Sequence, residues 1–526
     1  MKEFASLIQA LDSTNKTGLK LEAITAFLAG APDADKLWFL ALFTGKRPKR
    51  KVSTTLLKQW AIEAAGIPEW LFRESYAAVG DLGETISLIL PEPETYKAQP
   101  LAVWMRQIAE LEFKTETEKK EYVFKVWQQL PHTERFIFNK LLGGSFRVGI
   151  AAKSLINAVA AYYQLEPSTV AHALMGDWRR EDVSFEALIR GAYTQSHRSK
   201  PYPFCLAYAL DKEIADLGDM TGWQAEYKWD GIRGQLIRRE GEVFIWSRGE
   251  ELVTAQFPEI RDALLQWKGN FVIDGELLVY QNGAVQNFSA LQKRLNRKNL
   301  SRKILEELPV AVFAYDLIEW EGTDWRERPL SERREKLEQL FEANNNAPLY
   351  LSPIIHFTEW DELAAARAGS RQINSEGIML KHRDSPYHSG RKRGDWWKWK
   401  VDPLTLDAVL VYAQKGSGRR SGYYTDYTFA VKDGEELVTI AKAYSGLTDK
   451  EIQEVSRFVS NNAQEQFGPV RTVKPELVFE LAFEGISLSG RHKSGVALRF
   501  PRIVRWRRDK TVKDIDDIET IKKLIR

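Results

Sequence analysis

The chain has 526 residues, 44% of them hydrophobic, and its 75 lysines and arginines nearly balance 72 aspartates and glutamates, leaving a formal charge of +3. This length is too great for one hydrophobic core and predicts roughly three domains. The near-neutral balance excludes binding of nucleic acid through bulk charge, so any such surface must come from clustered cations. The single cysteine, Cys205, excludes an intramolecular disulfide and a multi-cysteine zinc site and indicates a reducing compartment.

The sequence contains no run of about 18 apolar residues, the length that a membrane-spanning helix needs. From Met1 onward it enters an amphipathic helical pattern instead. We therefore expect a soluble, unsecreted, cytoplasmic protein with no membrane partner. The seven histidines show no metal-ligand spacing.

Residues 1–196 are predicted to form an all-helical domain. Phe4, Leu7 and Leu11 recur at the spacing of one helix face, and similar patterns follow. Between two of the helices, five cations occupy six positions. These candidate DNA contacts are Lys46, Arg47, Lys49, Arg50 and Lys51. A solvated loop explains such a short basic run equally well.

A second candidate phosphate site lies later in the same domain. Gly143-Gly144 ends one predicted helix, and Gly149 precedes the next helical pattern, from Ala151 to Tyr163. Free amide groups at a helix start suit a DNA phosphate, and Arg147 and Lys153 lie beside this start. A plain connection between two helices also explains the glycines.

The pattern changes after a linker with two prolines, residues 197–203. Short strand patterns with intervening helices, such as the strand from Val310 to Ile318, predict an α+β domain over residues 203–400. We expect two of its strands to be Phe271 to Ile273 and Leu277 to Tyr280.

After Pro403, five short strand patterns follow, the last from Leu498 to Trp506, together with one helical pattern from Lys450 to Phe458. They predict a β-barrel of the oligonucleotide/oligosaccharide-binding (OB) kind over residues 401–526. The glycine-rich segment 416–422 lacks the lysine and spacing of a phosphate-binding loop. We expect it to be a mobile basic hairpin that contacts DNA through Arg419 and Arg420.

The central motif is Lys228-Trp229-Asp230-Gly231-Ile232-Arg233, a K-x-D-G-x-R pattern. The strand pattern from Trp223 to Tyr227 ends just before Lys228, and Asp230-Gly231 is a typical turn before a second strand from Gly234. A lysine at a strand end can point into a cleft and act as a nucleophile. A surface hairpin with solvated charges is the alternative for this stretch alone.

Further polar motifs stand at the edges of apolar strand patterns. In chain order they are Ser247-Arg248-Gly249-Glu250, Asp274-Gly275-Glu276, Ala314-Tyr315-Asp316, Glu376 to Lys381, Trp396 to Lys400, and the basic segment Arg499 to Lys510. Each alone has a structural explanation. Asp274-Gly275-Glu276 is typical of a turn between strands, and the alternation of aromatic and basic residues in Trp396 to Lys400 is equally typical of a half-buried edge strand with snorkelling lysines. Their order along one chain favours a common site.

This order of motifs resembles the covalent nucleotidyltransferase superfamily, and nearly the whole chain resembles an ATP-dependent DNA ligase of the bacterial type. The resemblance implies a helical DNA-binding domain, an adenylation domain and an OB domain. It implies ATP as the AMP donor, Mg²⁺ or Mn²⁺ as the metal, and nicked duplex DNA as the substrate. It also implies a monomer that acts at the nucleoid of a bacterium, alongside other DNA-repair proteins.

The same resemblance assigns roles to single residues. Lys228 becomes linked to AMP, and Glu226 accepts a hydrogen bond from the adenine amine. Glu276 and Glu376 serve the ribose and the metal ion. The α-phosphate is assigned to Lys381, Lys398 and Lys400. Other contacts to the nucleotide, the substrate phosphate or the leaving pyrophosphate are Arg233, Arg248, Arg499 and Arg502.

An aromatic ring that stacks on adenine is implied just before Asp316. Tyr315 stands where the family usually has phenylalanine. Phe313, two residues earlier, can face the same side of the strand, so both are candidates.

The chemistry accounts for these residue types independently. An amine attacks phosphorus only when neutral, and lowering a lysine pKa from about 10.4 to about 7 takes roughly 4 to 5 kcal/mol. Neighbouring cations disfavour the charged amine, attract the triphosphate and stabilise the transition state. Carboxylates suit Mg²⁺, which keeps several waters and binds substrate phosphates. We therefore expect cations and carboxylates to surround Lys228.

Two other functions stay open at this point. An RNA ligase or an mRNA capping guanylyltransferase shares these motifs, although the long helical region favours a DNA ligase. A non-catalytic DNA-binding protein with a degenerate nucleotide pocket would form no covalent adduct, and the intact lysine and carboxylates argue against it.

Overall fold

The computed structural model divides into two compact units. The first comprises Met1–Gln9, Arg47–Arg147 and Asp402–Arg526, and the second comprises Ala10–Lys46 and Val148–Val401. The structure describes residues 1–14, 16–44, 46, 50–144, 150–175, 178, 180, 183–191, 198–295, 297, 300–344, 346–416, 420, 422–467 and 470–525. Within these ranges no helix is long and apolar enough to cross a membrane.

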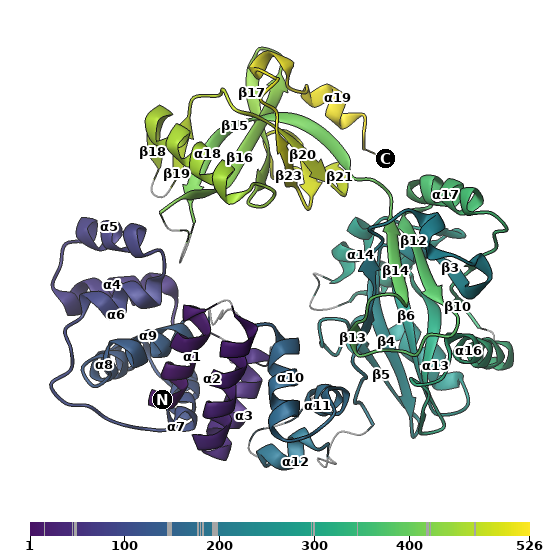
Figure 1. Cartoon of the computed structure of the whole chain (residues 1–526), viewed down its shortest axis with the longest axis horizontal. Coiled ribbons are helices and arrows are strands. Elements are labelled where there is room, and N and C mark those ends of the chain that lie inside the picture. The colour runs from purple at the N-terminus through teal and green to yellow at the C-terminus, as the bar shows by residue number, and fades with distance from the viewer. Residues whose placement is uncertain are drawn as a thin grey trace. The chain divides into compact units, whose positions relative to one another are not determined.

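The amino-terminal part of the chain is helical, as predicted (Figure 1). Its α-helices are α1 (Lys2–Ser13), α2 (Thr17–Gly30), α3 (Asp33–Phe43), α4 (Thr54–Ala65), α5 (Glu69–Val79), α6 (Leu82–Ile89), α7 (Leu101–Glu110), α8 (Glu116–Trp127), α9 (His132–Leu142), α10 (Ala152–Tyr162), α11 (Pro167–Leu174) and α12 (Phe185–Ile189). Side-chain oxygens of Ser53, Asp81 and Thr115 accept hydrogen bonds from the first-turn amides of α4, α6 and α8. These caps explain why the helices begin where they do.

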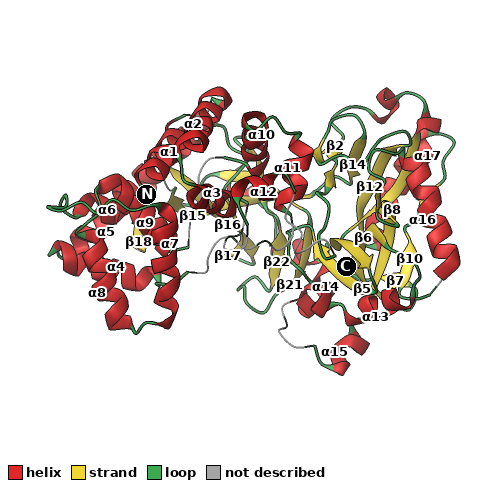
Figure 2. Cartoon of the chain, turned by 90° about the horizontal axis from the view of Figure 1, so that it is seen from below, coloured by secondary structure: helices red, strands yellow, loops and turns green. Residues whose placement is uncertain are grey.

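The α+β part of the second unit contains two main sheets (Figure 2). One has the order β10-β8-β6-β4-β5, with strands β4 (Ile232–Arg239), β5 (Glu242–Ser247), β6 (Phe271–Gln281), β8 (Val310–Trp320) and β10 (Leu349–Leu351), and with β7 (Ala284–Val285) and β9 (Thr323–Asp324) at its margins. The other has the order β11-β3-β12-β14-β2, with strands β2 (Tyr208–Ala209), β3 (Trp223–Trp229), β11 (Ile354–Ile355), β12 (Ser375–His382) and β14 (Trp396–Lys400). A short parallel pair, β1 (Cys205–Leu206) and β13 (Gly390–Arg391), completes this part.

The two sheets face each other between helices. Helices α13 (Pro258–Gln266) and α16 (Leu330–Asn344) pack on the outer face of the β4-β6-β8 sheet. Helix α17 (Trp360–Gly369) packs on the outer face of the β3-β12-β14 sheet. Because successive strand residues point to opposite faces, alternate residues of each sheet point into the space between the sheets.

One predicted pair of strands is wrong. The segments expected as Phe271 to Ile273 and Leu277 to Tyr280 form a single strand, β6, and Asp274-Gly275-Glu276 is its middle rather than a turn. A Cβ on Gly275 would lie 2.8 Å from Val312 Cγ1 and 3.1 Å from the Phe313 carbonyl oxygen. The glycine therefore permits close pairing of β6 with β8, where the register shifts.

The carboxyl-terminal region is a curled antiparallel sheet consistent with the predicted OB fold. Its long strand β15 (Leu404–Lys415) pairs with β16 (Tyr424–Asp433), β19 (Val470–Val473) and β20 (Val478–Phe483). The other elements are β17 (Glu436–Ala443), β18 (Ala463–Phe467), β21 (Gly485–Leu488), β22 (Val496–Arg499), β23 (Arg502–Trp506), α18 (Asp449–Asn462) and α19 (Ile518–Lys522).

The strand predicted from Leu498 to Trp506 is broken in two. Phe500 has a φ of 52°, a conformation that an extended strand does not contain, and Pro501 follows it. The five predicted strands therefore underestimate the number of strands in the described part of this region.

A buried ion pair joins α16 to β8. Arg333 donates from Nε to Asp316 Oδ1 at 2.8 Å and from Nη2 to Oδ2 at 3.0 Å, and both side chains are 0% exposed. Removing the guanidinium leaves a buried, uncompensated carboxylate. We expect Arg333→Met to lower the free energy of unfolding of this domain by about 3–5 kcal/mol, measured by urea denaturation.

The matched control is Arg302→Met, which breaks the exposed Arg302–Glu306 pair on α15 (Arg302–Glu307). Its cost should not exceed about 0.5 kcal/mol. Equal effects of the two substitutions would contradict a special contribution of the buried pair.

Candidate active site

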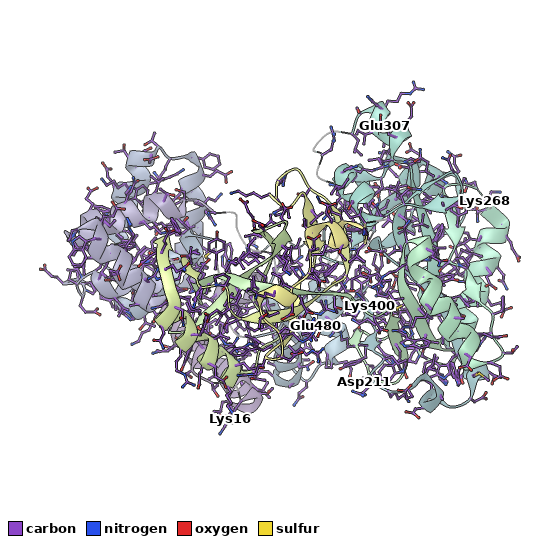
Figure 3. The ribbon with its side chains drawn as sticks, turned by 90° about the horizontal axis from the view of Figure 1, so that it is seen from above. Lys16, Asp211, Lys268, Glu307, Lys400 and Glu480 are labelled. Carbon is purple, nitrogen blue, oxygen red and sulfur yellow. The ribbon has the colours of Figure 1, made fainter. Side chains whose placement is uncertain are left out.

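Lys228 lies near the end of β3, and its Nζ is 2.5 Å from Glu376 Oε2 on β12. Lys400 on β14, labelled in Figure 3, places its Nζ 3.1 Å from the same oxygen. Burial raises the pKa of the Glu376 carboxyl, but the positive charges of both lysines lower it by more, so this pKa lies below its ordinary value. Three strands of one sheet thus bring together residues that are far apart in the sequence.

Two glycines allow close approach near the site, one between the turn after β3 and strand β6 and the other between β12 and β14. A Cβ on Gly231, in the turn after Lys228, would lie 2.3 Å from the Leu277 carbonyl oxygen. A Cβ on Gly377, which has a φ of 139°, would lie 2.3 Å from the Trp399 carbonyl oxygen. A larger residue at either position would push apart the strands that carry the site.

Glu276 comes from the opposite sheet and points toward the same space. Burial raises its pKa to about 8, because it outweighs the opposing effect of Lys228 and Arg233. No described residue donates a hydrogen bond to this carboxyl group. Glu276 is therefore a carboxyl group near Lys228 that no described residue holds by a hydrogen bond.

Arg233 is held by protein groups. Its Nη2 lies 2.6 Å from Asp274 Oδ2, its Nε lies 3.2 Å from Oδ1, and its Nη1 donates to the Cys205 carbonyl oxygen at 2.5 Å. The Tyr387 hydroxyl also donates to Asp274 Oδ2, at 2.7 Å. The buried network ties β4 and β6 to the segment that precedes β14.

Lys381, which the resemblance assigns to the α-phosphate, pairs with a buried glutamate in this structure. Its Nζ lies 2.7 Å from Glu226 Oε1, and both side chains are 2% exposed. Gln224 donates from Nε2 to the same oxygen at 2.9 Å. The ammonium group of Lys381 therefore belongs to a buried pair with Glu226 and not to the group formed by Lys228, Glu376 and Lys400.

The two aromatic candidates on β8 occupy different surroundings. Phe313 is buried and packs edge-on against Trp229, Tyr280 and Tyr350, with ring centroids 5.1 to 5.8 Å away. Tyr315 instead lies beneath Lys381, whose Nζ is 4.2 Å from the ring centroid. Tyr315 is thus the candidate that lies among the charged site residues.

Lys398 extends the cationic group. Burial lowers its pKa, as do the positive charges of four nearby side chains: Arg391, Lys228, Lys400 and Arg248. The sequence did not predict that Arg391, in β13, lies near the site residues. The basic run Arg391-Lys392-Arg393 was the available signal, but nothing in the sequence indicated that this run returns to β1.

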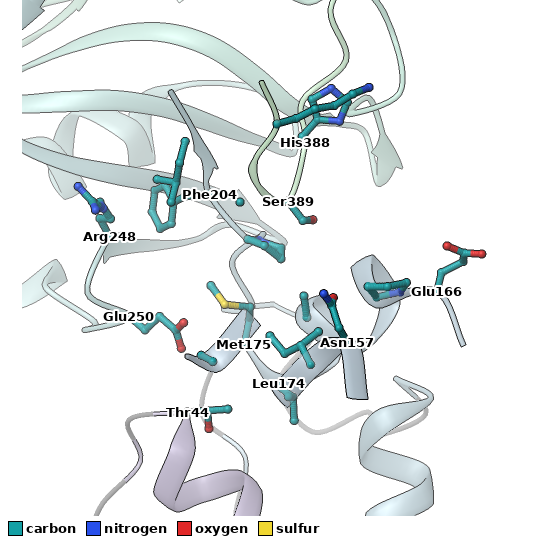
Figure 4. A pocket seen from close by; sticks show the side chains of 18 residues that line it. Thr44, Asn157, Glu166, Leu174, Met175, Phe204, Arg248, Glu250, His388 and Ser389 are labelled. Atoms are coloured by element: carbon teal, nitrogen blue, oxygen red, sulfur yellow. The ribbon is translucent and has the colours of Figure 1, made fainter. Parts of the chain in front are cut away.

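Arg248 also lines a cavity of about 580 Å³ within the second unit (Figure 4). The cavity wall includes Phe204 and Glu250 together with residues of α10 and α11. None of the other predicted nucleotide contacts lines this cavity. The cavity therefore shares only Arg248 with the predicted nucleotide contacts.

Arg502 and Arg499 belong to the first unit, and acids or rings of that unit contact them. Arg502 Nη1 is 2.9 Å from Glu484 Oε1, and Arg499 lies over the Phe500 ring. Similar ion pairs join the neighbouring cations of β23 and of the segment after it to acids of the same unit: Arg505 to Glu480, Arg507 to Asp407, Arg508 to Glu454 and Lys510 to Asp407. Five cations of this segment, Arg502, Arg505, Arg507, Arg508 and Lys510, are thus already matched by negative charge.

The predicted DNA contacts are only partly described. Arg47, Lys49, Arg147 and Arg419 lie outside the described residues, as does the side chain of Lys153. Arg50 donates from Nε to the Gly143 carbonyl oxygen at 3.0 Å, so this residue lies beside the Gly143-Gly144 segment. Three others have described contacts: Lys46 with the Trp178 ring, Lys51 with Glu112, and Arg420 with Asp449.

A strand-end lysine with carboxylates and cations between two sheets is an arrangement suited to nucleotidyl transfer. The family model "ATP dependent DNA ligase domain" matches residues 206–400. The models "DNA ligase N terminus" and "ATP dependent DNA ligase C terminal region" match residues 1–160 and 420–510.

Whole-chain comparisons agree. The chain is 30% identical over 559 residues to the "Probable DNA ligase" of Koribacter versatilis (strain Ellin345), covering 100% of this chain and 96% of that protein. It is 28% identical over 548 residues to "DNA ligase 1" of Korarchaeum cryptofilum (strain OPF8), covering 100% and 98%. The solved structure Pmar-Lig_Pre, 15% identical, matches with a TM-score of 0.63 over 96% of this chain and 99% of that one, a likeness that concerns the fold alone.

The chain therefore belongs to the family of ATP-dependent DNA ligases. The expected domain types, ATP as the nucleotide, and DNA ligation as the activity are confirmed. This result separates the chain from the RNA ligases, capping enzymes and non-catalytic DNA-binding proteins considered above.

The raised pKa of the buried Glu276 carboxyl can be tested by titration. We expect one glutamate carboxyl to titrate near pH 8 in the folded protein without nucleotide or metal, measured by NMR of protein with ¹³C-labelled glutamate. The folded state holds this proton more tightly than the unfolded state. The group's contribution to stability therefore falls as the pH rises from about 4.3 toward 8. The signal should be absent in Glu276→Gln, and its persistence there would assign it to another residue.

Proposed function

We propose that this ligase seals nicks in duplex DNA through a covalent adduct between AMP and Lys228. One observation carries the proposal: the Lys228 amine lies against Glu376 and Lys400, beside Glu276 and near Lys398 and Arg248. Lys228 is also the lysine of the K-x-D-G-x-R motif and lies near the end of its strand.

The first step forms a bond between Lys228 Nζ and the α-phosphorus of ATP, while the bond to the bridging oxygen breaks and pyrophosphate leaves. The ammonium must first lose a proton, since its lone pair forms the new bond. Glu376 contacts this amine and is the nearest base. The positive charges of Lys398 and Lys400 are suited to the developing negative charge on the phosphate oxygens.

In the later steps, AMP passes from Lys228 to the 5′-phosphate at the nick, and the 3′-hydroxyl displaces AMP and joins the strand. Arg248 is suited to the 5′-phosphate, because its cation lies near Lys398 and also borders the neighbouring cavity. Arg50, Lys51 and the other basic residues of the helical region are suited to the DNA backbone. Because one chain supplies all of these groups, we assign the enzyme a monomeric state. Its substrate in this proposal is nicked duplex DNA in the cytoplasm.

Magnesium fits the described residues through few protein ligands. No three histidine, cysteine, aspartate or glutamate side chains gather as a metal-binding cluster in the described ranges. The Glu276 carboxyl group has no hydrogen-bond donor among the described residues, whereas two lysines already hold Glu376. Glu276, once deprotonated, would therefore be the first ligand of the metal and Glu376 the second. When bound, Mg²⁺ neutralises charge on the phosphates, which supply its remaining ligands with water.

We expect Lys228→Ala to abolish formation of labelled enzyme-AMP from ATP labelled at the α-phosphate, because the substitution removes the amine that forms the bond to phosphorus. Enzyme-AMP is measured as acid-stable label and as an AMP-sized mass increase. The exposed substitution Lys212→Ala is the control and should keep wild-type labelling. A label that persists in Lys228→Ala would exclude Lys228 as the nucleophile.

We expect Glu276→Gln to raise the Mg²⁺ concentration needed for half-maximal enzyme-AMP formation by about tenfold, because an amide is a weaker ligand than a carboxylate. Glu242→Gln, an exposed strand residue, is the control. An unchanged Mg²⁺ requirement in Glu276→Gln would remove this residue from the metal site.

A further inference from the structure

Ser375 is the first residue of β12 and stands immediately before Glu376. It is 4% exposed, and its hydroxyl donates a hydrogen bond to the Lys228 carbonyl oxygen at 2.9 Å. This bond joins residues that are 147 positions apart in the chain. A buried side chain of β12 therefore holds the backbone of the residue that the proposed function makes the nucleophile.

The pairing of β3 with β12 is irregular at this point. The register shifts after Ser375, and β12 has one residue more than β3 before regular pairing resumes at Ile378. Glu376 and Gly377 therefore both face Lys228, which is the arrangement of a β-bulge. A bulge disrupts the ladder of backbone hydrogen bonds and re-aims the side chains beside it. Regular strand pairing alone thus does not fix the geometry at Lys228.

The Ser375 hydroxyl also binds within the bulge. It lies 2.9 Å from the Gly377 carbonyl oxygen and accepts a hydrogen bond from the Gly377 N–H at 3.4 Å. A hydroxyl can accept and donate at once, so it can join Gly377 to Lys228. On the other side of the bulge, the Glu376 carbonyl oxygen accepts from the Val401 N–H at 3.0 Å. The end of β14 thus holds the bulge on one side, and Ser375 joins it to β3 on the other.

The contact between the Lys228 amine and Glu376 is made across this bulge. Lys228 Nζ lies 2.5 Å from Glu376 Oε2. A nucleophile reacts only when it is aligned with the atom that it attacks, and a misplacement of about 1 Å can cost about a hundredfold in rate. A group that fixes the lysine backbone to the bulge therefore bears on the rate of the reaction.

We propose that Ser375 is a positioning residue for the nucleophile, a role that rests on the proposed lysyl-AMP step. Its hydroxyl fixes the backbone of Lys228 to the bulge that carries Glu376, so that the amine is held against its base and in line with the α-phosphorus. The hydroxyl touches neither ATP nor the amine. Its role belongs to the steps in which the bond between Lys228 and phosphorus forms or breaks.

The first experiment measures enzyme-AMP formation in single-turnover reactions of the full chain with ATP labelled at the α-phosphate. Ser375→Ala removes the hydroxyl alone. We expect the rate constant of enzyme-AMP formation to fall by about tenfold, because the amine is less well aligned. The KM for ATP should stay within about twofold of the wild-type value, because the hydroxyl does not contact ATP.

The last step of ligation gives a second readout. Nicked DNA that already carries AMP on its 5′-phosphate needs no lysyl-AMP, since Lys228 forms no bond to phosphorus when the 3′-hydroxyl displaces AMP. We expect Ser375→Ala to seal this DNA within about twofold of the wild-type rate, because only the lysine steps lose alignment. A general loss of structure would slow both reactions alike.

Two further substitutions separate the hydroxyl from the volume of the side chain. Ser375→Thr keeps the hydroxyl, and we expect it to form enzyme-AMP at a rate constant closer to that of the wild type than Ser375→Ala does. Ser375→Cys keeps nearly the same volume, but a thiol is only a weak hydrogen-bond donor. We expect Ser375→Cys to stay slow.

Ser370→Ala is the matched control. Ser370 is 0% exposed, and its hydroxyl donates to the Ala366 carbonyl oxygen of α17 at 3.2 Å. This substitution also removes one buried hydroxyl from the domain, but its hydrogen bond lies at the end of α17 and not between β3 and β12. Enzyme-AMP formation should keep the wild-type rate constant, whatever the effect on stability.

Several outcomes would overturn the positioning role and leave the lysyl-AMP step standing. They are a wild-type rate constant of enzyme-AMP formation in Ser375→Ala, an equal loss in enzyme-AMP formation and in sealing of adenylated DNA, and a Ser375→Thr protein no faster than Ser375→Ala. Wild-type speed in Ser375→Cys would assign the effect to packing and overturn it too. If the wild-type protein forms no adduct with ATP, the lysyl-AMP step itself fails, and the role of Ser375 fails with it.

Discussion

The structure depends on buried and half-buried opposite charges that meet between two facing sheets. A buried charge is stable only when a partner or a ligand compensates it. The β3-β12-β14 sheet supplies the pairs of Glu376 with Lys228 and of Glu226 with Lys381, and the opposite sheet supplies the pair of Asp274 with Arg233. Because each pair joins different strands, the positions of the strands and of the reactive groups are set together.

The sequence predicted the elements whose signals are local. The alternation in Trp396 to Lys400 predicted a half-buried strand, and in β14 Trp397 and Trp399 pack toward α17 while Lys398 and Lys400 point inward. The glycine in the K-x-D-G-x-R motif also lies in the predicted turn. These predictions need only the period of a strand and the chemistry of a turn.

The parts that the sequence did not predict depend on register between distant strands. In the antiparallel pairing of β3 with β12, Glu226 lies opposite Met379 and Gln224 opposite Lys381. Lys381 is therefore a diagonal neighbour of Glu226, which spacing along one strand cannot reveal. Likewise, Asp274-Gly275-Glu276 has the composition of a turn, and only the close approach of β8 explains a glycine in mid-strand.

The arginines of β23 and the segment after it have one more consequence. Arg502, Arg505 and Arg507 are each matched by a carboxylate of the same barrel, so this surface carries its own counterions. A phosphate that replaces such a carboxylate exchanges one anion for another and releases no small ion into solution. Contact between this surface and DNA should then depend on ionic strength less steeply than its number of arginines suggests.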